Sequence, residues 1–281
     1  MRIVFFTDAA FERREFFRYM YACVASRFPD VHIVAVERRR RGGIARTFRR
    51  YRRKVRRLGL LRSLEIFTSF PIRRALIRRD RSLIREMLLA IPRPAVDPDP
   101  AAAVRVPTAN GPEAVDAITG LEPDVLIQSG AGILRSRIFS IARLGTLNIH
   151  HGIAPLIRGM SSIDWALLEQ RPEWIGATIH MIDEGIDTGP VLAYVPVERE
   201  RPGEGFPRLY VRSTREAVAK LIDVLERLER GDVWSVDPPP GRREYRSSFS
   251  GWRHLAVELA LFLERRAARR GARDVRRSET R

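Results

Sequence analysis

The chain has 281 residues, 44% of them hydrophobic, and a single cysteine, Cys23. This composition provides a core for one large domain, and one cysteine excludes an intramolecular disulfide. Lysine and arginine outnumber aspartate and glutamate by 51 to 34, and the net charge of +17 raises the question of an anionic partner. The apolar runs are too short to cross a membrane or form a signal peptide, so we expect a cytoplasmic protein.

The N-terminal region predicts a strand, a helix and a second strand. Residues 2–6 and 32–36 are short apolar runs, and large apolar residues recur four positions apart through 11–28. Two strands joined by a helix of this length are typical of a parallel βαβ unit.

A basic insertion, 38–95, interrupts this alternation and ends in a proline-rich connector at 92–100. Apolar residues at helical spacing predict an amphipathic helix over 44–66, namely Ile44, Phe48, Tyr51, Val55 and Leu58. We favour packing of this apolar stripe on the domain. The alternative is that 38–58 lies on an anionic membrane surface.

The strand and helix alternation resumes after the connector. We expect strands at 104–106, 124–128, 146–149, 177–182 and 191–197, and helices at 112–120, 161–171 and 206–230. The fold class is therefore α/β, with a Rossmann-like, open and mostly parallel twisted sheet. We expect a catalytic domain over 1–235, and a proline-rich linker with a basic helical tail over 236–281.

Polar residues gather where the 146–149 strand ends. Asn148 and His150 are two residues apart, so both side chains can face the crevice in which open α/β sheets bind ligands. The glycine-punctuated loop 183–192 can present one of its carboxylates, that of Asp187 among them, to the same crevice.

These residue types suit acyl transfer to an amine. An Asn amide can donate to a developing oxyanion, and a carboxylate can take a proton. A carboxylate also favours the cationic form of a nearby histidine, which can then act as an acid. No metal and no serine or cysteine nucleophile is needed, because the amine itself attacks. Spacing alone leaves a buried structural histidine and a turn-forming aspartate as alternatives.

Several motifs follow one another in order between residues 122 and 197. LNIH and a proline precede RG, then WALL, then GATIHMIDEGIDTGPVL. This arrangement resembles the folate-dependent formyltransferase family and implies a sheet of the formyltransferase type. The resemblance places the family's catalytic Asn-x-His and late Asp on Asn148, His150 and Asp187.

The same resemblance implies 10-formyltetrahydrofolate as the formyl donor. It implies that the donor binds a loop of small and apolar residues and the turn before Asp187, namely Gly130, Ala131, Gly132, Ile133, Leu134, Asp183 and Gly185. It also implies that the acceptor contacts His151, Arg158 and Gly159. Trp165 and Trp174 are candidates for stacking on the acceptor, with core packing as the alternative for Trp165. We further expect a cis peptide bond between Ala154 and Pro155.

Comparison with the family's subgroups narrows the expected acceptor. The stretch FTDAAFERREFF contains no glycine, so it lacks the glycine-rich loop with which glycinamide ribonucleotide formyltransferase would bind a ribonucleotide phosphate. From the resemblance we expect residues 237–281 to be too short for the C-terminal barrel of methionyl-tRNA formyltransferase. With a first strand at residue 2, we also expect no N-terminal regulatory domain like that of formyltetrahydrofolate hydrolase. We expect an N-formyltransferase that acts on a small amine, with a nucleotide-linked amino sugar as the leading acceptor and a lipid-linked acceptor as an alternative. The alternatives are a methionyl-tRNA formyltransferase-like enzyme and a non-catalytic basic module that binds RNA or a membrane, with nucleic acid the less expected partner.

Overall fold

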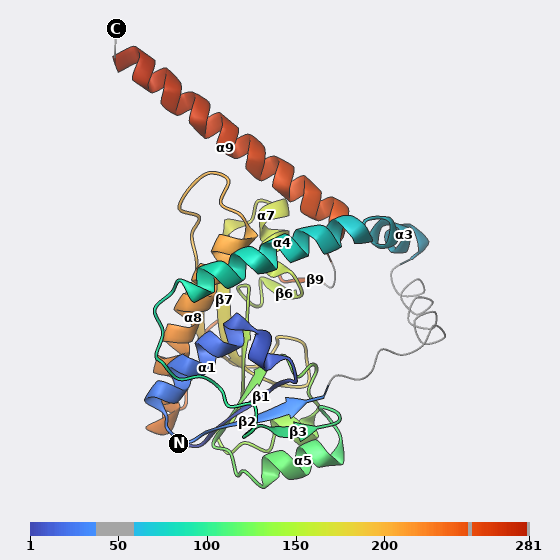
Figure 1. Ribbon diagram of the computed structural model, residues 1–281, viewed down its shortest axis with the longest axis vertical. Helices are drawn as coiled ribbons and strands as arrows, with labels where there is room; N and C mark the ends of the chain where they lie inside the picture. The colour runs from blue at the N-terminus through green and yellow to red at the C-terminus, as the bar shows by residue number, and fades with distance from the viewer. Residues whose placement is uncertain (38–58, 247–248, 280–281) are drawn as a thin grey trace.

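The computed structural model describes residues 1–37, 59–246 and 249–279 (Figure 1). Within them, seven strands form one open sheet in the order β3-β2-β1-β4-β5-β7-β8. Their bounds are β1 Ile3–Asp8, β2 Val31–Val36, β3 Val104–Val106, β4 Val125–Ser129, β5 Gly145–His150, β7 Gly176–Met181 and β8 Val191–Pro196. The first five strands in this order pair in parallel, and β7 pairs antiparallel with both β5 and β8, so β7 alone of the seven runs in the opposite direction. This confirms the predicted open, mostly parallel α/β sheet.

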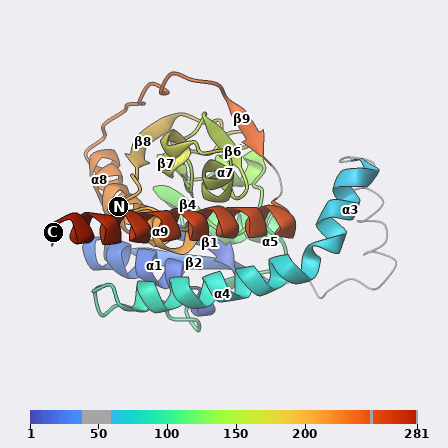
Figure 2. The ribbon, with the colours of Figure 1, turned by 90° about the horizontal axis from the view of Figure 1, so that it is seen from above.

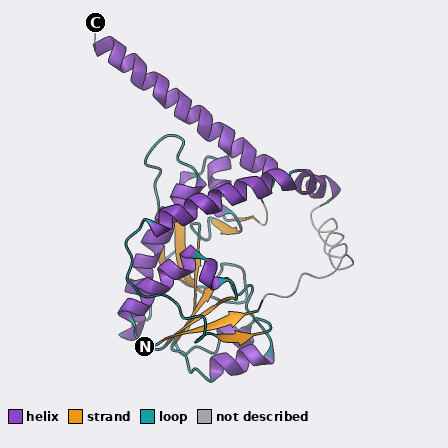
Figure 3. Cartoon of the chain, in the orientation of Figure 1, coloured by secondary structure: helices purple, strands orange, loops and turns teal. Residues whose placement is uncertain are grey.

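Helices cover both faces of this sheet (Figure 3). On one face, α1 (Glu15–Arg27) and α8 (Phe206–Glu229) pack on alternate strand residues such as Phe5 and Ile127. On the other face, α5 (Pro112–Thr119) and α6 (Ser136–Phe139) pack on the intervening residues, such as Phe6. Because successive side chains of a strand point to opposite faces of the sheet, the same strands contribute residues to two hydrophobic cores.

Helix α1 begins later than the predicted start at residue 11. A 3₁₀ turn, η1 (Phe11–Arg13), precedes it, and Asp8 Oδ1 accepts a hydrogen bond from the N–H of Ala10. This bond bends the chain directly after β1, so the helix starts only at Glu15. The connection between β1 and α1 thereby becomes a wall of the site.

The insertion is helical where the structure describes it, as α3 (Leu60–Thr68) and α4 (Phe70–Leu89). Residues 44–58 of the predicted amphipathic helix lie outside the described residues, and α3 covers the end of that prediction. The proline-rich connector 92–100 contains neither helix nor strand, as predicted.

Helix α9 (Gly251–Glu279) is joined to the body at its start, and its C-terminal part projects beyond the rest of the chain (Figure 1). Val257 and Leu261 pack in a cluster with Trp165 and Phe249. Viewed from above, α9 runs beside α4 (Figure 2). The two helices therefore stand over one end of the sheet. No helix in the described part of the chain is long and apolar enough to cross a membrane.

A second, two-stranded sheet pairs β6 (Ile157–Gly159) in parallel with β9 (Glu244–Arg246). Along the chain, β6 is followed by α7 (Ser162–Leu168) and by the short turn η2 (Pro172–Trp174). This pairing ties the segment after the proline-rich 237–241 to the loop that follows β5.

Candidate active site

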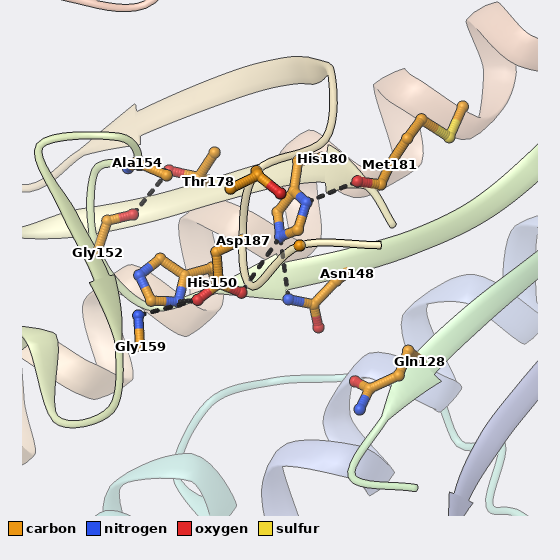
Figure 4. A network of polar contacts seen from close by, with 12 residues as sticks. Gln128, Asn148, His150, Gly152, Ala154, Gly159, Thr178, His180, Met181 and Asp187 are labelled. Atoms are coloured by element: carbon orange, nitrogen blue, oxygen red, sulfur yellow. Dashed lines mark hydrogen bonds and ion pairs between the residues drawn. The ribbon is translucent and has the colours of Figure 1, made fainter. Parts of the chain in front are cut away.

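Three neighbouring strands bring polar side chains to one level of the sheet. The register pairs Asn148 on β5 with Gln128 on β4 and with His180 on β7. The close view shows Asn148, His150, His180 and Asp187 directed toward one another (Figure 4). The predicted trio is therefore assembled, together with a histidine that the sequence reasoning missed.

His180 determines how the Asn148 amide is oriented. His180 Nδ1 lies 2.8 Å from the carbonyl oxygen of Met181, so Nδ1 carries the proton and Nε2 is the acceptor. Asn148 Nδ2 lies 3.1 Å from that acceptor and donates to it. The amide thus presents its NH₂ group to the site, and the second N–H remains available for an oxyanion.

Asp187 is held in the loop between β7 and β8. Its backbone adopts a left-handed conformation, with φ of 52°, and Gly159 N–H donates to Oδ2 at 3.0 Å. Burial raises the pKa of this carboxyl, but the His180 and His150 rings and the Gly159 N–H outweigh burial and lower it to about 2. Asp187 is therefore ionised at neutral pH.

His150 lies between Asp187 and the loop after β5. Its Nε2 is 3.1 Å from the Ile157 carbonyl and 3.3 Å from Ser162 Oγ, and its Nδ1 is 3.4 Å from Asp187 Oδ2. Burial lowers the pKa of His150, and the charge of Asp187 offsets this only in part. The carboxylate favours the cationic ring, as expected, but burial has the larger effect, so the pKa of His150 lies below its usual value. Near pH 7 the neutral ring donates from Nε2, and Nδ1 faces Asp187 ready to accept a proton.

The loop after β5 is secured by Thr178 of β7. Thr178 Oγ1 donates to the Gly152 carbonyl at 2.7 Å and accepts from the Ala154 N–H at 2.9 Å (Figure 4). The peptide bond between Ala154 and Pro155 is cis, which confirms that prediction. The loop carrying Ile157 and Gly159 is therefore anchored to the strand that carries His180.

The predicted donor loop follows β4 beside Asn148. Gly130 and Gly132 have φ of 98° and 103°, and a Cβ built on Gly132 would meet open space. Gln128 Nε2 donates to the Gly132 carbonyl at 3.0 Å, and the Ile133 side chain is 77% exposed. Leu134 is buried in the core, so its side chain is not available to a ligand.

Two other predicted donor contacts shape the turn before Asp187. Asp183 Oδ1 accepts from the Gly185 N–H at 3.0 Å and from Thr188 Oγ1 at 2.6 Å. A Cβ at Gly185 would collide with Thr188. These contacts give both residues a role in holding the loop.

The predicted acceptor residues lie in different surroundings. His151 is turned toward α8, with its ring centroid 4.3 Å from that of Tyr210 and its Nδ1 3.3 Å from Ser213 Oγ. Burial lowers the pKa of His151 to about 3. Arg158 has a buried Nε that finds no hydrogen-bond partner among the described residues, and a Cβ at Gly159 would collide with the Arg246 backbone. Trp165 and Trp174 are both buried in the core.

Two adjoining cavities open at these residues. The catalytic cavity, about 380 Å³, is lined by Asn148, His150 and Asp187. The α4 cavity, about 920 Å³, lies between the β1–α1 connection, α4 and α9. Residues that line both cavities are Ser161, Asp164, Phe206 and Tyr210. A ligand in the α4 cavity can therefore extend into the catalytic cavity.

The model of the formyl transferase family matches residues 85–225, which is half of the chain and includes Asn148, His150 and Asp187. The chain belongs to the formyl transferase family. That match excludes most of α4 and all of α9, so the α4 cavity is built largely from parts of the chain outside the family model.

Methionyl-tRNA formyltransferases resemble the chain over this central region. The protein from Legionella pneumophila is 39% identical over 119 residues, which are 41% of this chain and 37% of the relative. The protein from Synechococcus sp. is 31% identical over 137 residues, or 48% of this chain and 41% of the relative. The chain thus matches about two fifths of the length of these relatives.

Solved structures share the fold at low identity. A 4-N formyltransferase from Francisella tularensis has a TM-score of 0.51 and 13% identity, over 92% of this chain and 87% of that one. HypX from Aquifex aeolicus has a TM-score of 0.51 and 18% identity, over 89% of this chain and 30% of that one. These likenesses establish the arrangement of strands and helices.

His180, Thr178 and Asp164 are the site residues that sequence reasoning missed. Thr178 and His180 alternate on the strand that directly precedes the Asp187 loop, so strand periodicity could have placed both beside Asn148. Nothing in the local sequence distinguishes Asp164 from other acids that begin a helix.

Proposed function

We propose that the chain transfers the formyl group of 10-formyltetrahydrofolate to the amine of a small acceptor, with a nucleotide-linked amino sugar as the leading candidate. The observation that carries this proposal is the convergence of Asn148, His150 and Asp187 on one cavity, with the Asn148 amide oriented by His180. Family membership and the resemblance to other formyltransferases support it.

The residues around β4 fit a flat heterocyclic donor. The exposed Ile133 side chain and the open space at the Cβ position of Gly132 offer an apolar surface. The Gln128 and Asn110 side chains hold the loop by donating to the carbonyls of Gly132 and Ile133. Because β4 and β5 are adjacent, a donor held by this loop would lie beside the strand that carries Asn148.

The chemistry follows from the hydrogen-bonding capacities of the trio. The acceptor nitrogen attacks the formyl carbon, and the free N–H of Asn148 donates to the oxygen that becomes negative. His150 Nδ1 takes the proton that the amine loses, and the ionised Asp187, 3.4 Å away, stabilises the resulting imidazolium. His150 returns this proton to N10 of the donor as the carbon–N10 bond breaks, which yields the formamide and tetrahydrofolate.

A second candidate function is formylation of methionyl-tRNA. The 31–39% identity to methionyl-tRNA formyltransferases favours it, as does the net charge of +17. Both candidates use the same donor and catalytic residues, and they differ only in the acceptor.

The test offers the purified chain 10-formyltetrahydrofolate with a panel of amino-sugar nucleotides, and separately with methionyl-tRNA. We expect amine-dependent release of tetrahydrofolate, followed by absorbance, together with a formylated sugar nucleotide detected by mass spectrometry. Formylation of methionyl-tRNA alone would support the second candidate. Tight, salt-sensitive RNA or vesicle binding without turnover of any acceptor would contradict both.

A further inference from the structure

Asp164 is a buried carboxylate at the boundary between the two cavities. It is 5% exposed and lines both the catalytic cavity and the α4 cavity. Of the residues that line both, it alone is ionisable near neutral pH. It therefore stands where a ligand passes from the α4 cavity toward Asn148 and His150.

Among the residues that the structure describes, no cationic side chain contacts Asp164. Within the described residues its one ion-pair neighbour is His254, whose Nδ1 is 3.7 Å from Asp164 Oδ1. Burial and the charges of Arg73 and Arg79 lower the pKa of His254 to about 4, so this histidine is neutral at pH 7. The neighbouring buried acid, Asp80, is by contrast paired with Arg79 at 2.7 Å.

A buried carboxylate without a partner is costly to keep. Burial and the field of Asp80 raise the pKa of Asp164 to about 7, against the lowering effects of Ser161 and Arg73. A bound amine would supply the missing hydrogen-bond donors and positive charge. The carboxylate could also accept the first proton of an ammonium, which must be lost before the nitrogen can attack.

The α4 cavity is lined by both arginines and acids, and its acids other than Asp164 are each paired with an arginine. One face of α4 lines it with Arg73, Ile77, Arg81 and Ile84. Within the described part of the chain, Arg73 and Arg81 form no ion pair, and the buried Arg73 Nε has no hydrogen-bond partner. Unpaired guanidinium groups in a cavity are suited to bind phosphate oxygens.

We propose that Asp164 binds the amine of the acceptor, and that the acceptor carries a phosphate or diphosphate held by Arg73 and Arg81 in the α4 cavity. This inference rests on the proposed formyl transfer and names the acceptor class for that same site. The volumes of about 380 and 920 Å³ leave room for an acceptor that spans both cavities. The basic insertion then contributes part of the acceptor site through α4.

The first experiment measures steady-state kinetics with the best amino-sugar nucleotide of the panel. We expect Asp164→Asn to raise the KM for this acceptor about 10-fold or more, the usual scale for losing a hydrogen bond to a charged group. The donor dissociation constant, from tryptophan fluorescence, reports that the variant is folded. An acceptor KM within twofold of wild type would overturn the role of Asp164.

The second experiment tests the phosphate contacts. The double change Arg73→Gln and Arg81→Gln should raise the KM about 10-fold for the nucleotide-linked amine, and little for the same amino sugar without phosphate. Arg78→Gln is the matched control, because Arg78 is an exposed arginine of α4 that does not line the cavity. Equal changes for both acceptors would overturn the phosphate assignment.

Two measurements on the wild-type chain need no variant of Asp164. The amine-bearing acceptor should bind at least 10-fold more tightly than its hydroxyl analogue, and equal binding would overturn the amine contact. Inorganic pyrophosphate should bind to wild type and, in calorimetry, much more weakly to the double arginine variant. Absent formylation of every amine, with pyrophosphate binding intact, would refute the proposed function, whereas formylation without these preferences would refute this inference alone.

Discussion

Asn148 Nδ2 on β5 donates to His180 Nε2 on β7 across 3.1 Å, between residues that the antiparallel register places opposite each other. The proton on His180 is in turn assigned by the Met181 carbonyl, 2.8 Å from Nδ1. A backbone oxygen thus determines which end of the Asn148 amide faces the substrate. We therefore expect His180 to act through Asn148 and Asp187, as a positioning residue.

His180→Ala removes the acceptor that orients Asn148. We expect kcat to fall about 10-fold or more, because the amide then loses its preference for presenting an N–H to the oxyanion. The acid limb of the kcat–pH profile should also move to higher pH, since the His180 ring helps to lower the pKa of His150, the proposed base. His32→Ala is the control, because His32 is partly exposed and paired with Asp30 on the surface. An unchanged kcat and pH profile would show that His180 only packs.

His150→Ala and Asp187→Ala should each lower turnover about 10²-fold or more, as expected for loss of proton transfer. Neither should unfold the domain, which circular dichroism and donor binding can check. His151→Ala should have the smaller effect, because His151 packs against Tyr210 and contacts neither Asn148 nor Asp187 in the described site. A nearly active His150 variant beside an inactive His151 variant would reverse the assignment.

Ionisation of Asp164 should lower the free energy of unfolding as the pH rises. Its pKa is raised to about 7 in the folded state, against about 3.9 for an unfolded aspartate, so the protonated folded form loses its advantage between about pH 4 and 7. Asp164→Asn does not titrate. The unfolding free energy of this variant relative to wild type should therefore increase by on the order of 2–4 kcal/mol from pH 4 to pH 8.

Urea unfolding of both proteins at pH 4 and pH 8 provides the measurement. The comparison between the two pH values cancels any fixed cost of the asparagine. If the difference in unfolding free energy between the two proteins does not change with pH, the pKa of Asp164 is not raised in the folded state.

Gly189 sets the path of the loop that carries Asp187. A Cβ at this position would collide with the carbonyl oxygen of Met181, and backbone cannot yield as a flexible side chain can. Gly189→Ala should therefore displace Asp187 and lower kcat about 10-fold or more, with donor affinity as the second readout. Gly271→Ala, in α9 with nothing within 4 Å, should leave activity unchanged. Wild-type kinetics for Gly189→Ala would show that the loop adjusts without moving the carboxylate.

The fold class, and the placement of Asn148 and His150 on one face of a strand, were predictable from the sequence because each depends on local pattern. Short apolar runs alternating with helical periodicity predict a mostly parallel sheet, and the two-residue spacing of Asn148 and His150 places both side chains on one face of a strand. Asp187 was predicted from the resemblance of its loop to a known motif. The start of α1 was predicted too early, because the turn at Asp8 depends on a side-chain hydrogen bond that periodicity does not reveal.

Only the tertiary structure decided the electrostatics and the outer walls of the site. His150 is less basic than a histidine beside a carboxylate would suggest, because burial is a property of the packed fold and outweighs the local charge. The β5–β7 register chose His180 as the partner of Asn148. The cavity that joins Asp164 to Arg73 exists only because α4 and α9, distant in the chain, lie side by side above the same end of the sheet. Contacts between such distant segments follow from packing and leave no periodic signal in the sequence.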